Sequence, residues 1–473
     1  MNDITAIFAF LKYCLGYKRN MSRMIAGMDW QELYSFASKQ ALLGLCFEGI
    51  ERLGKEYSEE LRLNPIGREL LMTWMGKAQQ IRRQNMKVNA VASKLYSMLR
   101  EDGLRCCILK GQGNALIYPN AYSRNPGDID VWVNASRKRI MEYAQKKFEL
   151  GDDIRLQHLE TSLDGVPVEL HFFPCSMNNP IYHARLQKWF RRNADLQCSH
   201  IVGLPDGAGD IAIPTTAFNV VYQLTHLYHH FFDEGIGMRQ IIDYYYVVCD
   251  FYKVYQNSSK ITPSLFFDKA SCTRQFESEL SLHSLASLFP LKEGSTSHPD
   301  PLTLRGEGGN RPTRCSEPLR SKDGGPSKVS PDCAGWDRLS IEGDNSAGST
   351  TVVTSYASTA LDVAQRELKY LGLWKFAGAV MYVLKEVLGL SEDKMIVPVD
   401  EKRGRLLLAE ILDGGNFGRH FSKYGGFTHQ SMGKKYFLKI WRNMHFVRYY
   451  PAEALCEPLF RTWHFFWRLK YKK

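Results

Sequence analysis

The chain has 473 residues, 44% of them hydrophobic and 12% aromatic, which is enough for two or three domains with sizeable cores. Its net charge is +11, but residues 434–473 hold ten Lys and Arg against two Glu and so carry +8 of that charge. The remainder is nearly neutral, so a general nucleic-acid-binding surface is not indicated and no stable nucleic-acid partner is expected.

The eleven cysteines are scattered and include no Cys-x-x-Cys pair, so they do not form a metal or disulfide framework. We expect reduced thiols in a cytoplasmic protein. The sequence contains no run of 18 apolar residues, so we expect no membrane-spanning helix. The N-terminal stretch ITAIFAFLKYCLG lacks a basic region and a cleavage site, and we interpret it as a first amphipathic helix rather than a signal peptide.

Residues 1–103 form a predicted N-terminal helical region. Its clearest segment is 81–102, where apolar residues recur at helical spacing: Val88, Val91, Leu95, Met98 and Leu99. Gly103 follows the last turn and marks the end of that helix.

Residues 104–180 change to strand and turn patterns and predict a compact α/β core. Asp164-Gly165 is a strong signal for a tight hairpin, and Ser136 is a typical helix cap. The expected elements are strands at 105–111, 128–134, 154–161 and 166–172, and helices at 113–119 and 136–148.

Helical patterns return in 181–290 and again in 356–473, which ends in a tail rich in basic and aromatic residues. Between them, 291–355 is dense in Gly, Pro and Ser and poor in aliphatic residues, so we expect a disordered insertion. The predicted fold class is α+β, with a small mixed sheet and flanking helices embedded between N-terminal and C-terminal helical regions.

Carboxylates gather on one face of the predicted sheet. Alternate residues of a strand share a face, so Asp128 and Asp130 point the same way while the apolar residues between them face a core. On the hairpin strand, Glu169 and His171 take the face opposite the apolar residues. If the two strands are neighbours, three carboxylates converge on one open surface. Clustered carboxylates need a cation, and Mg²⁺ prefers such oxygen ligands, so this pattern favours metal-assisted phosphoryl or nucleotidyl transfer.

The same core supplies groups suited to phosphate. Lys110-Gly111 ends the first predicted strand immediately before a helix, where glycine lets backbone N–H groups approach an anion. Lys110 and Arg124 carry charges that offset a triphosphate.

These residues resemble a known family. LKG at 109–111, a Tyr-Pro pair at 118–119, Arg124, DIDVWV at 128–133 and VELH at 168–171 are similar to the polymerase-beta-type nucleotidyltransferase superfamily, and more narrowly to its bacterial uncharacterised nucleotidyltransferase family. Three later stretches are also similar to that family: HLYHH at 226–230, GMRQIIDYY at 237–245 and GGNFGRHF at 414–421. The resemblance covers roughly 1–285 and 360–460.

The resemblance implies a nucleotidyltransferase sheet with two Mg²⁺ ions held by Asp128, Asp130 and Glu169. Glu169 matches the carboxylate that helps to activate the acceptor hydroxyl. Lys110, Gly111 and Arg124 would bind the phosphates of a nucleoside triphosphate. The acceptor would be a hydroxyl on a sugar, a small molecule or a protein. The alternative is a catalytically silent binding or regulatory protein that keeps this fold.

Three other features have competing interpretations. His226, His229 and His230 lie on one predicted helix and serve in packing, in lining the pocket, or in binding zinc. The glycine-rich stretch 414–420 is a plain turn or a loop folded back near the active site. The tail 436–473 packs on its domain, makes weak contact with an anionic membrane surface, or contacts nucleic acid.

Overall fold

The computed structural model describes residues 3–18, 20–150, 155–256, 349–421 and 432–471. Contacts divide the chain into a large unit, Met1–Leu280 with Thr350–Lys473, and a segment, Ser281–Ser349, of which only Ser349 is described. Most of the predicted insertion at 291–355 therefore lies outside the described residues. Its last part, 349–355, belongs to a helix.

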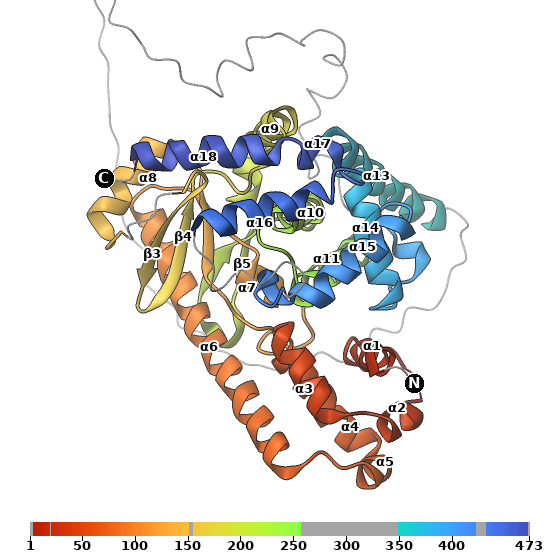
Figure 1. Ribbon diagram of the computed structural model, residues 1–473. Helices are drawn as coiled ribbons and strands as arrows, with labels where there is room; N and C mark the ends of the chain where they lie inside the picture. Colours follow the sequence, from red (N-terminus) through yellow and green to blue (C-terminus); the bar gives the residue numbers. More distant parts are fainter. Residues whose placement is uncertain (1–2, 19, 151–154, 257–348, 422–431, 472–473) are drawn as a thin grey trace, which may run out of the picture. The chain divides into compact units, whose positions relative to one another are not determined.

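The N-terminal region is helical, as predicted, and ends in a long helix (Figure 1). Five short helices precede it: α1 Asp3–Cys14, α2 Ser22–Ala26, α3 Trp30–Lys39, α4 Leu43–Glu56 and α5 Ser58–Leu63. The long helix, α6 Arg68–Glu101, buries its C-terminal half against the sheet through the predicted stripe of Val88, Val91, Leu95 and Leu99.

The sheet has four strands in the order β1-β2-β4-β3. Its strands are β1 Cys106–Leu109, β2 Ile129–Val133, β3 His158–Leu163 and β4 Val166–His171, with helices α7 Gly111–Ala115 and α8 Arg137–Lys147 between them. β2 pairs with β4 in parallel, and the other two pairings are antiparallel. The α+β fold with a mixed sheet is thus confirmed.

The two faces of the sheet are buried against different helices. Alternating residues of β2 and β4, among them Val131 and Leu170, pack with α6 and α8 in one apolar cluster. On the other face Trp132 packs against Phe190 and Phe218, which come from helices α9 Pro180–Gln197 and α10 Thr216–Asp233. Polar residues of the sheet therefore sit beneath α10, at one end of this second face.

The predicted hairpin and helix cap both form. Asp164 and Gly165 have φ values of 50° and 71°, so both central residues of the two-residue turn adopt the positive φ of a type I′ hairpin. The Ser136 side chain accepts a hydrogen bond from the backbone N–H of Arg139 and caps α8.

Several element boundaries differ from the prediction. α7 begins at Gly111 and ends at Ala115, earlier than the expected 113–119, and β2 begins one residue after Asp128. The region 181–290, predicted to be helical, also contains a small antiparallel pair, β5 Ile201–Gly203 and β6 Asp210–Ala212, around the short helix η1 Pro205–Gly207. Strands of three residues are too short to show an alternating pattern.

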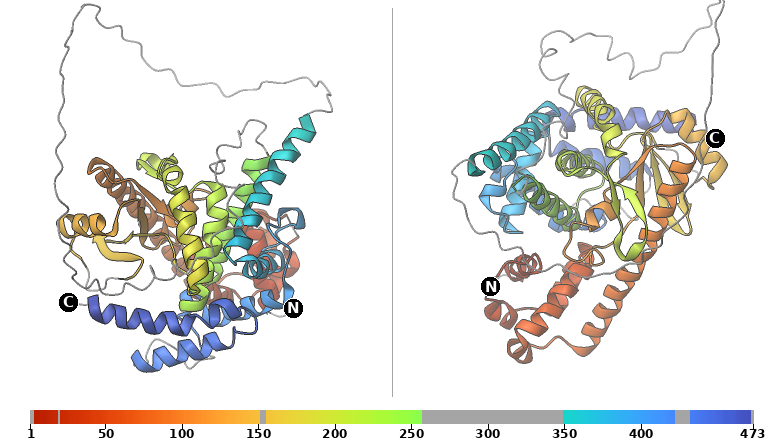
Figure 2. Two further views of the ribbon diagram at one scale, coloured as in Figure 1. Left: turned by 90° about the horizontal axis from the view of Figure 1, so that it is seen from above. Right: turned by 180° about the vertical axis from the view of Figure 1, so that it is seen from behind.

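The remaining helices complete the large unit. They are α11 Met238–Gln256, α13 Ser349–Tyr370, α14 Trp374–Glu386, η3 Glu392–Lys394, α15 Glu401–Gly414, η4 Asn416–Gly418, α16 Met432–Met444, α17 Pro451–Ala454 and α18 Glu457–Tyr471. Helices α16 and α18 run side by side, where Tyr436 is hydrogen-bonded to Thr462 (Figure 2). Within the described ranges, no helix is both long enough and apolar enough to cross a membrane.

Candidate active site

Strand register brings the predicted carboxylates together. β2 and β4 are neighbours, and Asp130 lies directly opposite Glu169 in their parallel pairing. Asp128 immediately precedes β2. Its backbone lies close to Gly111, since a Cβ added at Gly111 would be 3.8 Å from the Asp128 carbonyl oxygen. The surface is less open than expected, because Asp130 is only 5% exposed while Asp128 is exposed.

The carboxylates differ in charge state. The negative charge of Asp130 is the largest cause that raises the pKa of Asp128 to about 6. Desolvation by the groups packed around the carboxylate adds to this rise, although the residue as a whole is exposed. Burial alone would raise the pKa of Asp130, but the ammonium of Lys110 and a hydrogen bond from His171 outweigh it and hold that pKa well below its usual range. The pair thus has one firmly ionised member and one that is easily protonated.

Lys110 is the internal counter-ion of this site. Its Nζ lies 2.9 Å from Asp130 Oδ1 and 2.6 Å from Nε2 of His226 on α10. Burial favours the neutral amine, but the surrounding carboxylates outweigh it and raise the pKa of Lys110. Its backbone has φ 50° and ψ −128°, a conformation that side-chain-bearing residues rarely adopt and that is commonly found at functional sites.

Arg124 pairs with a carboxylate outside the predicted set, that of Asp243. Its guanidinium is 4% exposed and donates to both oxygens of Asp243 on α11, with Nε and Nη2 each 2.8 Å away. Tyr118 also donates to Asp243 Oδ1, at 2.7 Å. As the site is arranged here, Arg124 fixes the loop that leads into Asp128, and its role in phosphate binding stays a prediction.

Two histidines border the carboxylates on the sheet. His171 Nε2 lies 3.0 Å from Asp130 Oδ1 and 3.1 Å from Glu169 Oε2. Burial lowers the pKa of His171, but its hydrogen bonds to these two carboxylates outweigh it and raise that pKa to about 9. His158 on β3 lies opposite His171, with Nδ1 3.2 Å from Glu169 Oε2. Sequence reasoning missed His158, because its face depends on the register of β3.

The histidines of α10 extend the site. His226 contacts Lys110, and His230 Nε2 lies 3.0 Å from His226 Nε2. The ring of His230 packs on Phe417 of the glycine-rich stretch, with ring centroids 5.2 Å apart. His226 thus borders the site, and the stretch 414–420 folds back toward it rather than forming a remote turn.

The donor set suits a hard divalent cation. Asp128, Asp130 and Glu169 offer carboxylate oxygens, which are the ligands that Mg²⁺ takes. The raised pKa of Asp128 has the charge of Asp130 as its largest cause, so the site carries negative charge that a cation would stabilise. These residues therefore fit the magnesium that the sequence predicts.

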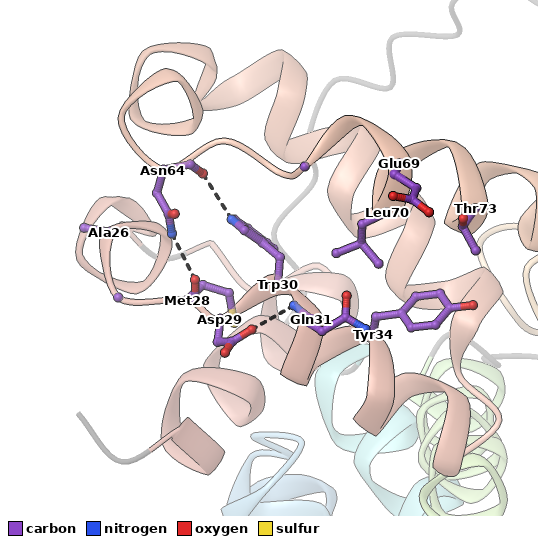
Figure 3. Close-up of a pocket in the computed structure, with 12 residues that line it drawn as sticks. Ala26, Met28, Asp29, Trp30, Gln31, Tyr34, Asn64, Glu69, Leu70 and Thr73 are labelled. Atoms are coloured by element: carbon purple, nitrogen blue, oxygen red, sulfur yellow. Dashed lines mark hydrogen bonds between the residues drawn. The ribbon is translucent and has the colours of Figure 1, made fainter.

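A separate cavity lies in the N-terminal helices (Figure 3). It measures about 970 Å³ and is lined by residues of 26–34 and 64–73. Its wall is fixed by Trp30, which donates to the Asn64 carbonyl, and by Asp29, which caps α3. None of the predicted site residues lines this cavity. The active-site assignment therefore depends on the carboxylate face of the sheet and not on this hollow.

Comparison with known proteins gives one match. Residues 26–261 match the sequence model of a family described as uncharacterised nucleotidyltransferase. No curated protein and no solved structure matches the chain. The matched segment contains both carboxylate strands and α10 but not 360–460, for which a resemblance was also expected. Residues 26–261, just under half of the chain, are thus similar to the uncharacterised nucleotidyltransferase family.

Proposed function

We propose that the protein transfers a nucleoside monophosphate from a nucleoside triphosphate to an acceptor hydroxyl on a sugar, a small molecule or a protein, with release of pyrophosphate. The observation that carries this proposal is the register of β2 and β4, which sets Asp130 opposite Glu169 beside Asp128. The family match supports the same reaction class.

The carboxylates have distinct roles. Asp128, Asp130 and Glu169 would hold two Mg²⁺ ions, which neutralise charge on the attacking and leaving oxygens. Glu169 accepts the proton of the acceptor hydroxyl. His171 bonds to both Asp130 and Glu169 and so holds their carboxylates in place.

The phosphate side is built from the turn after β1. Gly111 has a φ of 36° and lies close to the backbone of Asp128, so the N–H groups of this turn would bind the phosphates of a triphosphate at the carboxylates. Lys110 supplies positive charge there. Arg124 would bind phosphate beside Lys110 only if its ion pair with Asp243 opens. The closed pair instead supports a role for Arg124 in positioning the loop before Asp128.

Pyrophosphate release tests the proposal. The purified chain is incubated with the four nucleoside triphosphates, Mg²⁺ and a cell extract as the source of acceptor. Replacing Asp128 and Asp130 together by Asn removes several kcal/mol of transition-state stabilisation, which corresponds to about a 10³-fold loss of rate. Asp195→Asn, an exposed carboxylate away from the site, is the control. Equal release by the double variant and the wild type would refute the assignment.

A catalytically silent binding protein is the second candidate. The observation that favours it is the ammonium of Lys110, which already neutralises Asp130 at 2.9 Å. This alternative predicts that calorimetry detects triphosphate binding while no pyrophosphate is released with any acceptor source.

Weak contact with an anionic membrane surface is proposed for α16. Phe437 and Trp441 are 71% and 61% exposed and lie one helical turn apart, with Met444 on the same stripe. The two acidic residues of 432–471, Glu453 and Glu457, are buried, so the charge that this part of the chain exposes is positive. Exposed aromatic residues combined with basic ones are typical of helices that lie on membranes.

Co-sedimentation with vesicles tests this contact. Binding to phosphatidylserine-containing vesicles but not to phosphatidylcholine vesicles is expected, and Phe437→Ser with Trp441→Ser should abolish it. Leu63→Ser, at a residue that is 87% exposed elsewhere, is the matched control. Equal sedimentation of the double variant, or a dimer that the double variant dissociates, would overturn the proposal.

A further inference from the structure

His158 is a buried histidine without a hydrogen-bond partner. Its side chain is 2% exposed, and neither ring nitrogen makes a hydrogen bond within the described part of the chain. A histidine that serves only in packing normally bonds at least one nitrogen, because an unsatisfied buried polar atom is costly. Both nitrogens lie near carboxylates without a hydrogen bond to them, Nδ1 3.2 Å from Glu169 Oε2 and Nε2 3.8 Å from Glu160 Oε1, and this arrangement points to a ligand.

Two further donors lie beside His158. Its Nδ1 is 3.2 Å from Glu169 Oε2, and the same oxygen is 3.1 Å from His171 Nε2. Ligand atoms of the three residues all lie within 4.8 Å of one another. Two donors each about 2.1 Å from one ion, at tetrahedral or right angles, are about 3.0–3.4 Å apart. The two separations that end at Glu169 Oε2, 3.2 Å from His158 and 3.1 Å from His171, fall in that interval.

The cross-strand register holds this arrangement in place. His158 and His171 are directly opposed on the antiparallel strands β3 and β4, and Glu169 is two residues from His171 on the same face. Three donors thus project from two paired strands, which positions them more firmly than loop residues. Asp130 Oδ1, 3.0 Å from His171 Nε2, offers a fourth oxygen.

We propose that His158, Glu169 and His171 form a binding site for a divalent transition-metal ion of the Zn²⁺ class, at the β3 edge of the carboxylate face. Imidazole nitrogen selects such ions over Mg²⁺, which takes oxygen ligands. The site shares Glu169, and Asp130 where it gives the fourth oxygen, with the proposed magnesium centre, and it adds the two histidines. Binding of the ion would replace the hydrogen bonds between His171 Nε2 and these carboxylates. It holds whether or not the chain transfers nucleotides.

Cobalt titration tests the site directly. The full chain, freed of metal with a chelator, is titrated with Co²⁺, whose visible absorption reports the ligand set. One Co²⁺ per chain is expected, and it should stay bound in excess Mg²⁺. His158→Phe keeps the volume of the ring but removes its nitrogens. We expect it to weaken Co²⁺ binding at least as much as the ~10- to 100-fold typical of losing a supporting partner. His445→Phe, at an exposed histidine of the C-terminal region, is the control.

Asp128→Asn separates this proposal from the proposed function. It leaves all three ligands in place, so it should keep Co²⁺ binding even as nucleotidyl transfer is lost. A chain that binds Co²⁺ without releasing pyrophosphate refutes the transfer alone, and a chain that does the reverse refutes this site alone.

X-ray absorption of the wild-type chain loaded with Zn²⁺ needs no variant and counts imidazole ligands. Two are expected. Binding through oxygen alone, displacement of Co²⁺ by Mg²⁺, or unchanged affinity in folded His158→Phe would each overturn the proposal.

Discussion

Replacing Arg124 by methionine is expected to destabilise the protein strongly. Arg124 and Asp243 are both buried, and two hydrogen bonds of 2.8 Å join them. Methionine fills similar space but removes the guanidinium that pairs with the Asp243 carboxylate. The carboxylate then keeps only the hydrogen bond from Tyr118 and the nearby charge of Arg239. Removing one partner of a buried pair costs about 3–5 kcal/mol. That is a third or more of the ~5–15 kcal/mol that stabilises a typical domain.

A second substitution isolates the charge effect. Asp243→Asn keeps the oxygen that accepts from Tyr118 but removes the unpaired charge. The double variant Arg124→Met/Asp243→Asn should therefore recover at least about 2 kcal/mol of the loss. Arg105→Met breaks the exposed pair with Asp195 instead and should cost less than about 1 kcal/mol.

Urea unfolding followed by circular dichroism measures all four chains. The midpoint should fall most for Arg124→Met, partly recover in the double variant and barely move for Arg105→Met. A loss below about 1 kcal/mol for Arg124→Met, or no recovery in the double variant, would refute a structural role for the pair. Either outcome would favour the phosphate-binding role of Arg124 that the sequence predicts.

Two further predictions concern stability. Burial raises the pKa of Glu453 to about 7, so the fold prefers its protonated form. Its contribution is complete below about pH 4.5 and is lost as pH rises through 7. Glu453→Gln should gain about 3 kcal/mol relative to wild type between pH 4.5 and 8. Gly44→Ala should destabilise, because its Cβ would clash with the backbone oxygen of Ser123 in the loop before β2, whereas Gly76→Ala, with nothing within 4 Å, should stabilise α6 by about 0.5–1 kcal/mol.

Unfolding curves at several pH values check the first of these two predictions, and thermal midpoints check the second. A Glu453→Gln variant whose stability parallels the wild type at every pH would contradict the buried-acid account. Equal thermal midpoints for Gly44→Ala and the wild type would contradict the second prediction, because they would mean that the loop before β2 moves away from α4 at no cost in stability.

Local patterns predicted the faces of the strands and the turn between them. Alternation placed Asp130 and Glu169 on one face, and Asp164-Gly165 predicted a turn that needs two positive φ values. Both signals depend on neighbouring residues alone. The fold class followed from the same patterns.

Contacts between distant segments could not be predicted in this way. Lys110 meets His226 across 116 positions of the chain, and that contact depends on how α10 lies over the sheet. Nothing local shows that Arg124 bonds to Asp243 rather than to a phosphate. His158 likewise joined the site only once the β3 register was known.

The distance along the chain from the hairpin turn to Glu169 fixes which face of the sheet the carboxylate takes. Side chains of a strand alternate between faces, so each residue between Gly165 and Glu169 decides which face the carboxylate takes. Deleting one residue of that stretch would turn Glu169 and His171 toward the apolar cluster and turn their apolar neighbours outward. Deleting two residues would restore the faces but would set Glu169 opposite a β2 position two residues away from Asp130. The three residues between Gly165 and Glu169 are thus as much a requirement of the proposed site as the carboxylate itself.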